Sequence, residues 1–225
     1  MKKLVQGLLE FQRTGFPAWK ETFARLAAGQ HPDCFFVSCS DSRVVPNIFA
    51  STHPGELFVA RNVGNMVPPA DASGMACGDT SEASALEYAL LALEVPDIVV
   101  CGHSGCGAMN AICDARVPEG SLNLSRWLEL GAPSLARLRA GELAQDGLPA
   151  ADQLSQINVL QQLENLRTYP VVRQRLAEGR LQLHAWWFDI FAARVHNWRA
   201  ELGRFVPIDE TEGERIISDI RGRRL

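Results

Sequence analysis

Short apolar runs alternate with helix-forming stretches along most of this chain, and that alternation restricts its fold more than any other feature. The runs are too short for buried helices and suit strands that are covered on both faces. They lie at Cys34–Ser38, Leu57–Ala60, Ile98–Cys101 and Leu181–Phe188. Ala, Leu and Glu are dense from about Thr80, a candidate helix N-cap, to Glu94, and again over Ile157–Thr168. This order predicts an α/β fold with a mostly parallel central β-sheet flanked by helices.

The length of 225 residues predicts one domain that spans residues 1–225. Residues 1–30 predict two N-terminal amphipathic helices, because apolar side chains repeat there every three or four positions. A first helix this apolar packs either within its own subunit or on a neighbouring one, and the residues alone leave both possibilities open. After Asp209 the chain has little to bury, so we expect a frayed tail over about residues 210–225.

The charge balance indicates a small-molecule partner. A formal net charge of −4 and a pI near 5.8 offer no general electrostatic reason to bind nucleic acid or an anionic membrane. The apolar start of the chain is interrupted by Glu10, Gln12 and Arg13, before a secretory or membrane-spanning segment could form. We therefore expect a cytoplasmic protein with no nucleic-acid and no membrane partner.

Six cysteines in a chain without an export signal point to metal binding or thiol chemistry rather than to disulfides. Cys34, Cys77, Cys101 and Cys113 are interpreted as small buried side chains, because an isolated cysteine usually packs as a small hydrophobe. The two remaining cysteines, Cys39 and Cys106, lie in sequence blocks that follow predicted strands.

The two blocks are Cys39–Arg43 and Cys101–Gly107, and each comes directly after an apolar run. Because the carboxyl ends of strands in an open α/β sheet line one crevice, the blocks can meet there although they are distant in sequence. Catalytic zinc sites use three protein ligands and leave the fourth position open. Cys39, His103 and Cys106 supply three such ligands, and no fourth cysteine or histidine at metal-binding spacing is present to indicate a purely structural site.

Asp41 and Arg43 place two charges directly after a buried strand. An unpaired charge is costly in such a place, so we expect the Arg43 guanidinium to hold the Asp41 carboxylate through two hydrogen bonds. That pair would lie beside the metal, where Asp41 could contact either the guanidinium or the ion.

Five sequence motifs in this order resemble the β-class carbonic anhydrases, with particular similarity to the bacterial cyanate-operon and plant-like branch. The likeness runs from the first helix to about Pro207, and Leu163–Pro170 adds to it. The motifs are Cys39–Arg43, Pro54–Phe58, Arg61–Pro69, Leu86–Ala89 and Gly102–Gly107.

The resemblance implies a carbonate dehydratase, which hydrates carbon dioxide reversibly to bicarbonate and a proton by a zinc-bound hydroxide. It implies Zn²⁺ on the three ligands named above, with Asp41 and Arg43 as the catalytic pair. It also implies a homodimer or a dimer-based higher homo-oligomer, in which the N-terminal helical arm packs on the partner. The substrate pocket at the dimer interface would be formed by Gln30, Phe58, Val63, Tyr88 and Gly107.

Some positions depart from the family pattern. The segment between Pro69 and Tyr88 is a few residues longer than usual, which bears on the rim of the pocket. One branch of the family carries a noncatalytic bicarbonate site built from a Trp, an Arg and a Tyr. The matching positions here are Phe36, Arg61 and Phe188, so only the Arg remains and we expect no such site.

Three other functions fit parts of the sequence. Hydrolysis of carbonyl sulfide or carbon disulfide could use the same site, since the shape of the tunnel and not the motifs decides the substrate. A non-catalytic bicarbonate-binding protein would be expected to lack Asp41 or Arg43, and both are present. A thiol redox protein is disfavoured because the chain has no Cys-x-x-Cys pair.

Overall fold

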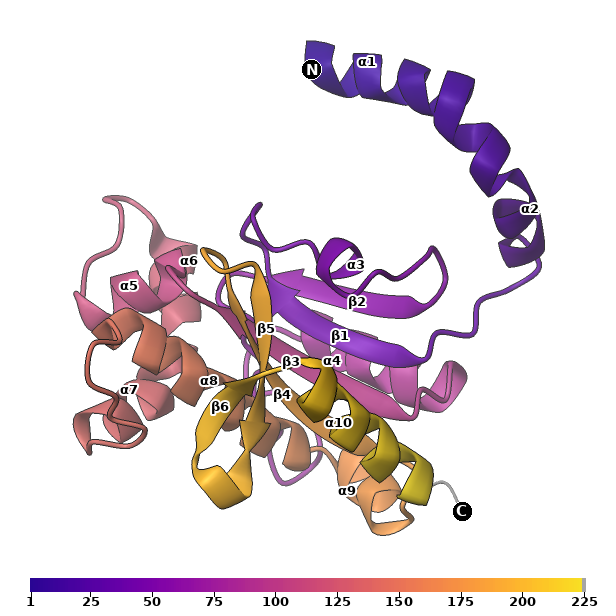
Figure 1. The fold of residues 1–225 in the computed structure, drawn as a ribbon. Helices are drawn as coiled ribbons and strands as arrows, with labels where there is room; N and C mark the ends of the chain where they lie inside the picture. The colour runs from indigo at the N-terminus through magenta and orange to yellow at the C-terminus, as the bar shows by residue number, and fades with distance from the viewer. Residues whose placement is uncertain (224–225) are drawn as a thin grey trace.

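The computed structural model describes residues 1–223 and contains one six-stranded sheet with the strand order β2-β1-β3-β4-β5-β6 (Figure 1). β1, β2, β3 and β4 run parallel, and β5 and β6 add antiparallel strands at one edge. The strands are β1 (Cys34–Cys39), β2 (Leu57–Asn62), β3 (Asp97–His103), β4 (Gln182–Asp189), β5 (Arg194–Arg199) and β6 (Arg204–Pro207). The predicted α/β fold with a mostly parallel sheet is confirmed, and the four predicted strands are β1 to β4.

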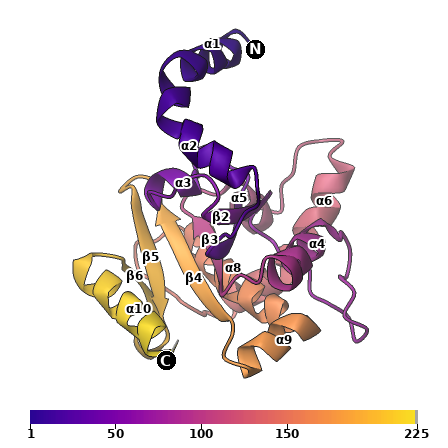
Figure 2. The same ribbon diagram turned by 90° about the vertical axis from the view of Figure 1, so that its right-hand side faces the viewer.

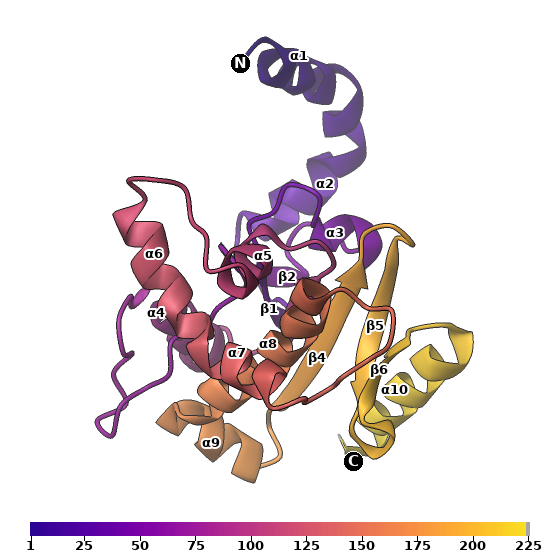
Figure 3. The ribbon, with the colours of Figure 1, turned by 90° about the vertical axis from the view of Figure 1, so that its left-hand side faces the viewer.

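Helices cover the sheet because its strands are apolar on both faces. The helical elements after the N-terminal arm are α3 (Pro46–Phe49), α4 (Ser81–Glu87), η2 (Tyr88–Ala92), α5 (Gly107–Cys113), α6 (Leu122–Leu128), η3 (Glu129–Gly131), α7 (Ala132–Arg139), α8 (Ala150–Arg167), α9 (Pro170–Ala177), η4 (Ala200–Leu202) and α10 (Glu210–Arg223). The main core joins α4, α8 and α9 to side chains such as Phe35, Val37 and Val100. On the opposite face, Phe36 and Phe188 form a smaller cluster with Phe49 of α3. α5 and α7 pack beside α8 (Figure 3).

The N-terminal arm is one continuous bent helical segment rather than the two separate helices that we expected. α1 (Lys2–Glu10) passes through a π-helical stretch, η1 (Phe11–Gly15), into α2 (Phe16–Leu26). Pro17 does not break the segment because it lies in the first turn of α2, where the missing N–H is tolerated. None of the arm's residues is buried, and the arm projects away from the sheet (Figures 1 and 2).

The prediction of a frayed tail after Asp209 is wrong for residues 210–223, which form α10; residues 224 and 225 lie outside the described part of the chain. Asp209 accepts a hydrogen bond from the backbone N–H of Glu212 at 2.9 Å and so caps the helix. The Glu212 carboxylate is only 7% exposed, and it accepts hydrogen bonds from Asn197, Arg199 and Arg215. α10 is therefore anchored to β5 through one buried carboxylate.

Replacing this anchor should weaken the fold in a pH-dependent way. Hydrogen bonds from Arg215, then from Asn197 and Arg199, lower the pKa of Glu212 to about 2 although burial opposes them. A lowered pKa means that the ionised carboxylate stabilises the fold above a pH of about 5, and that this contribution disappears as the pH falls toward about 2. We expect Glu212→Gln to lower the free energy of unfolding at neutral pH by roughly 1–3 kcal/mol.

The measurement is thermal or urea unfolding of both proteins from neutral pH to about pH 3. The difference between wild type and variant should shrink as the pH falls. Glu214→Gln is the matched control, because Glu214 lies on the same helix and is exposed. A variant difference that stays constant over this range, or an equal effect of the control, would contradict the assignment.

Candidate metal centre

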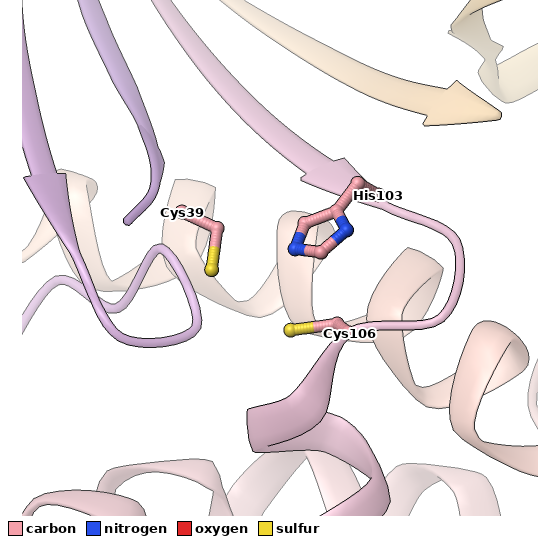
Figure 4. Close-up of side chains that lie close together, drawn as sticks. All are labelled: Cys39, His103 and Cys106. Carbon is pink, nitrogen blue, oxygen red and sulfur yellow. The ribbon is translucent and has the colours of Figure 1, made fainter. Parts of the chain in front are cut away.

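Two neighbouring strands and the turn after β3 bring together three side chains that could hold a metal ion (Figure 4). β1 and β3 pair in parallel and end at Cys39 and His103, so their carboxyl ends lie side by side. The chain then turns at Gly105, whose φ of +61° favours glycine, and reaches Cys106 before α5 begins. The sulfur atoms of both cysteines and a ring nitrogen of His103 lie within 4.8 Å of one another, and all three residues are buried.

The His103 ring is oriented with one nitrogen available as a ligand. Its Nδ1 lies 3.0 Å from the Ser104 carbonyl oxygen, which assigns the ring proton to Nδ1 because a carbonyl can only accept. Nε2 then carries a lone pair, and this buried atom has no hydrogen-bond partner among the described residues. A buried polar atom without a partner is costly, and a metal ion at the centre of the three ligands would satisfy it.

The two thiols are poised to bind a cation together. The Cys106 thiol lowers the pKa of Cys39 to about 4, although burial opposes the shift, and a backbone N–H of Gly64 donates to the Cys39 sulfur at 3.4 Å. The same contact with Cys39, together with burial, raises the pKa of Cys106. Without a cation the pair therefore retains one proton, whereas a divalent cation would allow both sulfurs to ionise. Two thiolates and one imidazole are ligands that suit zinc.

The expected contact between Asp41 and Arg43 is present and bidentate. Arg43 donates from Nε to Oδ1 at 2.9 Å and from Nη2 to Oδ2 at 2.7 Å, and its Nη2 also donates to the Gly105 carbonyl at 3.0 Å. These bonds hold the pKa of the Asp41 carboxyl well below its ordinary value, so the group is ionised near neutral pH. Oδ2 of Asp41 lies 4.0 Å from Nε2 of His103, which places the carboxylate beside the ligand cluster.

Comparison with known proteins identifies the family of this chain. A family profile described as "Carbonic anhydrase" matches residues 34–195. The chain belongs to the β-carbonic anhydrase family. It is similar to the carbonic anhydrase of Pseudomonas aeruginosa, with 40% identity over 223 residues and 99% of each chain covered. Carbonic anhydrase 1 of Escherichia coli O157:H7 is 41% identical over 209 residues, with 92% of each chain covered.

Solved β-carbonic anhydrase structures share the fold. The structure of the β-carbonic anhydrase CcaA superimposes with a TM-score of 0.85 at 36% identity, and the match covers 92% of this chain and 98% of that one. A tetrameric β-carbonic anhydrase of Sordaria macrospora gives a TM-score of 0.75 at 26% identity, covering 92% of this chain and all of the other. The assignment to the cyanate-operon and plant-like branch stays a prediction.

The other residues that the β-carbonic anhydrase resemblance singled out are only partly gathered within one chain. The rings of Phe58 and Tyr88 contact each other with centroids 5.7 Å apart, and Gly107 begins α5 directly after the last ligand. Val63 is half exposed, and its carbonyl accepts a hydrogen bond from Trp127 at 2.7 Å. Gln30 lies at the base of the arm, where it lines a different hollow with Phe23, Leu26 and Gly55. The pocket role of these residues stays a prediction.

The remaining cysteines test the interpretation of isolated cysteines as small buried side chains. Cys101 is buried as expected, and Cys34 and Cys113 are half-buried. Cys77 is exposed, and the prediction for it is wrong because its loop lies on the surface.

Arg61 donates to the backbone carbonyls of Cys39 at 3.0 Å and Asp41 at 2.8 Å, so it supports the loop that carries the Asp41 carboxylate. We did not predict that role, since no sequence signal identifies a side chain that bonds to distant backbone carbonyls. Among residues 1–223, no helix is long and apolar enough to cross a membrane.

Proposed function

We propose that this chain catalyses the reversible hydration of carbon dioxide to bicarbonate and a proton, with a zinc ion held by Cys39, His103 and Cys106. The observation that carries the proposal is the convergence of the three ligand atoms within 4.8 Å at two strand ends, where Nε2 of His103 is buried without a partner. A zinc ion in such a site supplies a Lewis acid that makes water a nucleophile near neutral pH. Three ligands leave room for water or substrate.

Asp41 supplies the second part of the chemistry. Its carboxylate is ionised, is held by the Arg43 guanidinium, and has one oxygen close to the ligand cluster. A carboxylate in this position can accept a hydrogen bond from the attacking water and orient it toward carbon dioxide. Because Arg43 also bonds to Gly105 in the ligand turn, the carboxylate keeps a defined position relative to the three ligands.

The direct test is metal analysis of the purified protein together with stopped-flow carbon dioxide hydration followed by a pH indicator. One zinc per chain and a hydration rate well above the uncatalysed reaction are expected. Zinc-loaded protein that leaves carbon dioxide unchanged but hydrolyses carbonyl sulfide or carbon disulfide would reassign the substrate. Bicarbonate binding without turnover of any of these substrates would indicate a binding protein.

We further propose a homodimer, or a higher homo-oligomer built from dimers, in which Gln30, Phe58, Val63, Tyr88 and Gly107 form the substrate pocket. Apolar walls such as Phe58 suit carbon dioxide, and the Gln30 amide can donate to a bicarbonate oxygen. Gln30 lines a hollow at the base of the arm whose lining does not include Phe58, which favours a pocket completed by a second copy. Zinc held by reduced cysteines is consistent with the cytoplasmic location that we propose.

The N-terminal arm favours a dimer because its apolar side chains are exposed to solvent in the single chain. Leu4 is 67% and Leu8 66% exposed in α1, on the same face of an amphipathic helix. We expect Leu8→Asp to shift the protein toward monomer, since a charge would be buried in the interface. Size-exclusion chromatography with light scattering measures the shift, and Gln6→Glu on the polar side of α1 is the control. An unchanged mass for Leu8→Asp would show that this face does not join the subunits.

Bicarbonate should inhibit only as a simple product. Phe36 and Phe188 lie in an apolar cluster around Phe49, and neither can donate a hydrogen bond to an anion. The guanidinium of Arg61 already bonds to two backbone carbonyls. A titration of the hydration rate with bicarbonate near neutral pH is therefore expected to fit non-cooperative inhibition. A sigmoidal loss of activity would reveal an anion site that the apolar cluster should exclude.

A further inference from the structure

One face of α8 is polar although it is buried. Ser155, Asn158 and Gln162 are almost completely inaccessible, and Asn165 is 7% exposed. Together with Asp152 in the first turn, these residues follow the three- and four-residue spacing of one helix face. Buried amides and hydroxyls destabilise a fold unless hydrogen bonds satisfy them, so the partners of this polar face indicate its purpose.

The first half of this face bonds to the turn that carries two of the ligands. Ser155 Oγ accepts from the His103 backbone N–H at 3.2 Å and donates to the His103 carbonyl at 2.9 Å. Asp152 accepts from the Gly105 N–H at 2.7 Å. Gly105 is also the residue whose carbonyl accepts from Arg43, so Asp152 and Arg43 restrain the ligand turn from two sides. Close packing also requires a small residue before His103, since a Cβ at Gly102 would lie 2.7 Å from a methyl group of Val159.

Asn158 reaches the third ligand through a different loop. Its Nδ2 donates to the Gly64 carbonyl at 3.1 Å, and the N–H of Gly64 donates to the Cys39 sulfur. The amide is held in turn, because its Oδ1 accepts from Gln162 at 2.8 Å and from Ser134 at 3.1 Å. A side chain with this many partners has one orientation, and it fixes the loop that bonds to the sulfur.

We propose that Asp152, Ser155 and Asn158 of α8 are positioning residues that hold the backbone around all three metal ligands. The proposal rests on the zinc site of the proposed function. Partners in the shell around metal ligands fix ligand orientation, and their loss typically weakens metal binding by about 10–100-fold. Farther along the same face, Asn165 donates at 2.8 Å to the carbonyl of Val67, which lies three residues after Gly64 and does not itself bond to a ligand sulfur. It makes the same kind of bond as Asn158, but its connection toward the ligands is indirect and runs through Gln162, to which it donates at 3.1 Å.

The test compares Asn158→Ala with Asn165→Ala, since each variant loses one buried bond from an amide to a backbone carbonyl. Zinc affinity is measured by competition with a chromophoric chelator, and thermal unfolding is measured with and without zinc. Both variants should unfold at lower temperature without zinc, but only Asn158→Ala should bind zinc about 10–100-fold more weakly. Zinc should therefore raise its unfolding temperature less than it raises that of Asn165→Ala.

A second pair of variants covers the case in which Asn158→Ala does not fold. Asp152 is partly exposed in the first helical turn, where a substitution is tolerated better, and Asp152→Ala should also weaken zinc binding. Gln153→Ala is its control, because Gln153 donates to the carbonyls of Gln145 and Leu148 in a loop without ligands. Wild-type zinc affinity in both Asn158→Ala and Asp152→Ala would overturn the proposal. Failure of the wild type itself to bind zinc would instead overturn the proposed function.

Discussion

Replacing Cys106 by serine is expected to remove zinc and hydration activity together. A serine hydroxyl does not ionise near neutral pH, so the site would lose one of two thiolates and keep only Cys39 and His103 as strong ligands. Loss of a mere supporting partner already weakens metal binding by about 10–100-fold, and we expect loss of a ligand to exceed about a hundredfold. Metal analysis after dialysis against a chelator and stopped-flow carbon dioxide hydration measure the two losses on the same sample.

Cys101→Ser is the matched control for this experiment. Cys101 is buried on β3, two residues before His103, and its sulfur is not among the three atoms that converge. The control should therefore keep its zinc even if its stability falls. Full zinc and full rate in Cys106→Ser would show that the ligand assignment is wrong, and equal zinc loss in both variants would show that the effect is only a general loss of folding.

The convergence of Cys39 and His103 could be predicted from the sequence because it follows from a simple rule. Cys39 and His103 end two predicted strands, and parallel neighbouring strands bring their carboxyl ends to one edge of the sheet. Arg43 follows Asp41 closely, so the contact between them is local and could be predicted as well. In each case the positions along the chain were sufficient.

Features that depend on distant partners could not be predicted in this way. α10 was expected to be frayed because its own residues bury little, whereas its stability depends on Glu212 meeting Asn197 and Arg199 of β5. A capping signal was present in the sequence, since Asp209 is followed three residues later by Glu212. The polar face of α8 gave no such signal, because Asn158 has a function only where the loop at Gly64 passes it.

Replacing Asp41 by asparagine should lower the turnover by about a hundredfold or more while zinc remains bound. The change keeps the size of the side chain but removes the charge, and it places an amide N–H₂ group against the Arg43 donors, so one of the two bonds is lost. A positioned acid–base group typically contributes about 10²–10⁴-fold to a rate, which sets the scale of the expected loss.

Asp71→Asn is the control for Asp41→Asn, because the two aspartates have the same local structure in different places. Each carboxylate accepts from the backbone N–H two residues later, at 3.0 Å from Arg43 and at 2.8 Å from Ser73, but Asp71 lies in an exposed turn. Stopped-flow rates and zinc content of both variants separate the chemical role from the structural one. Asp41→Asn with a wild-type rate would remove the carboxylate from the mechanism. Loss of zinc in Asp41→Asn alone would show that Asp41 supports the metal site rather than the reaction. The control makes the same change in the same kind of turn, away from the ligands.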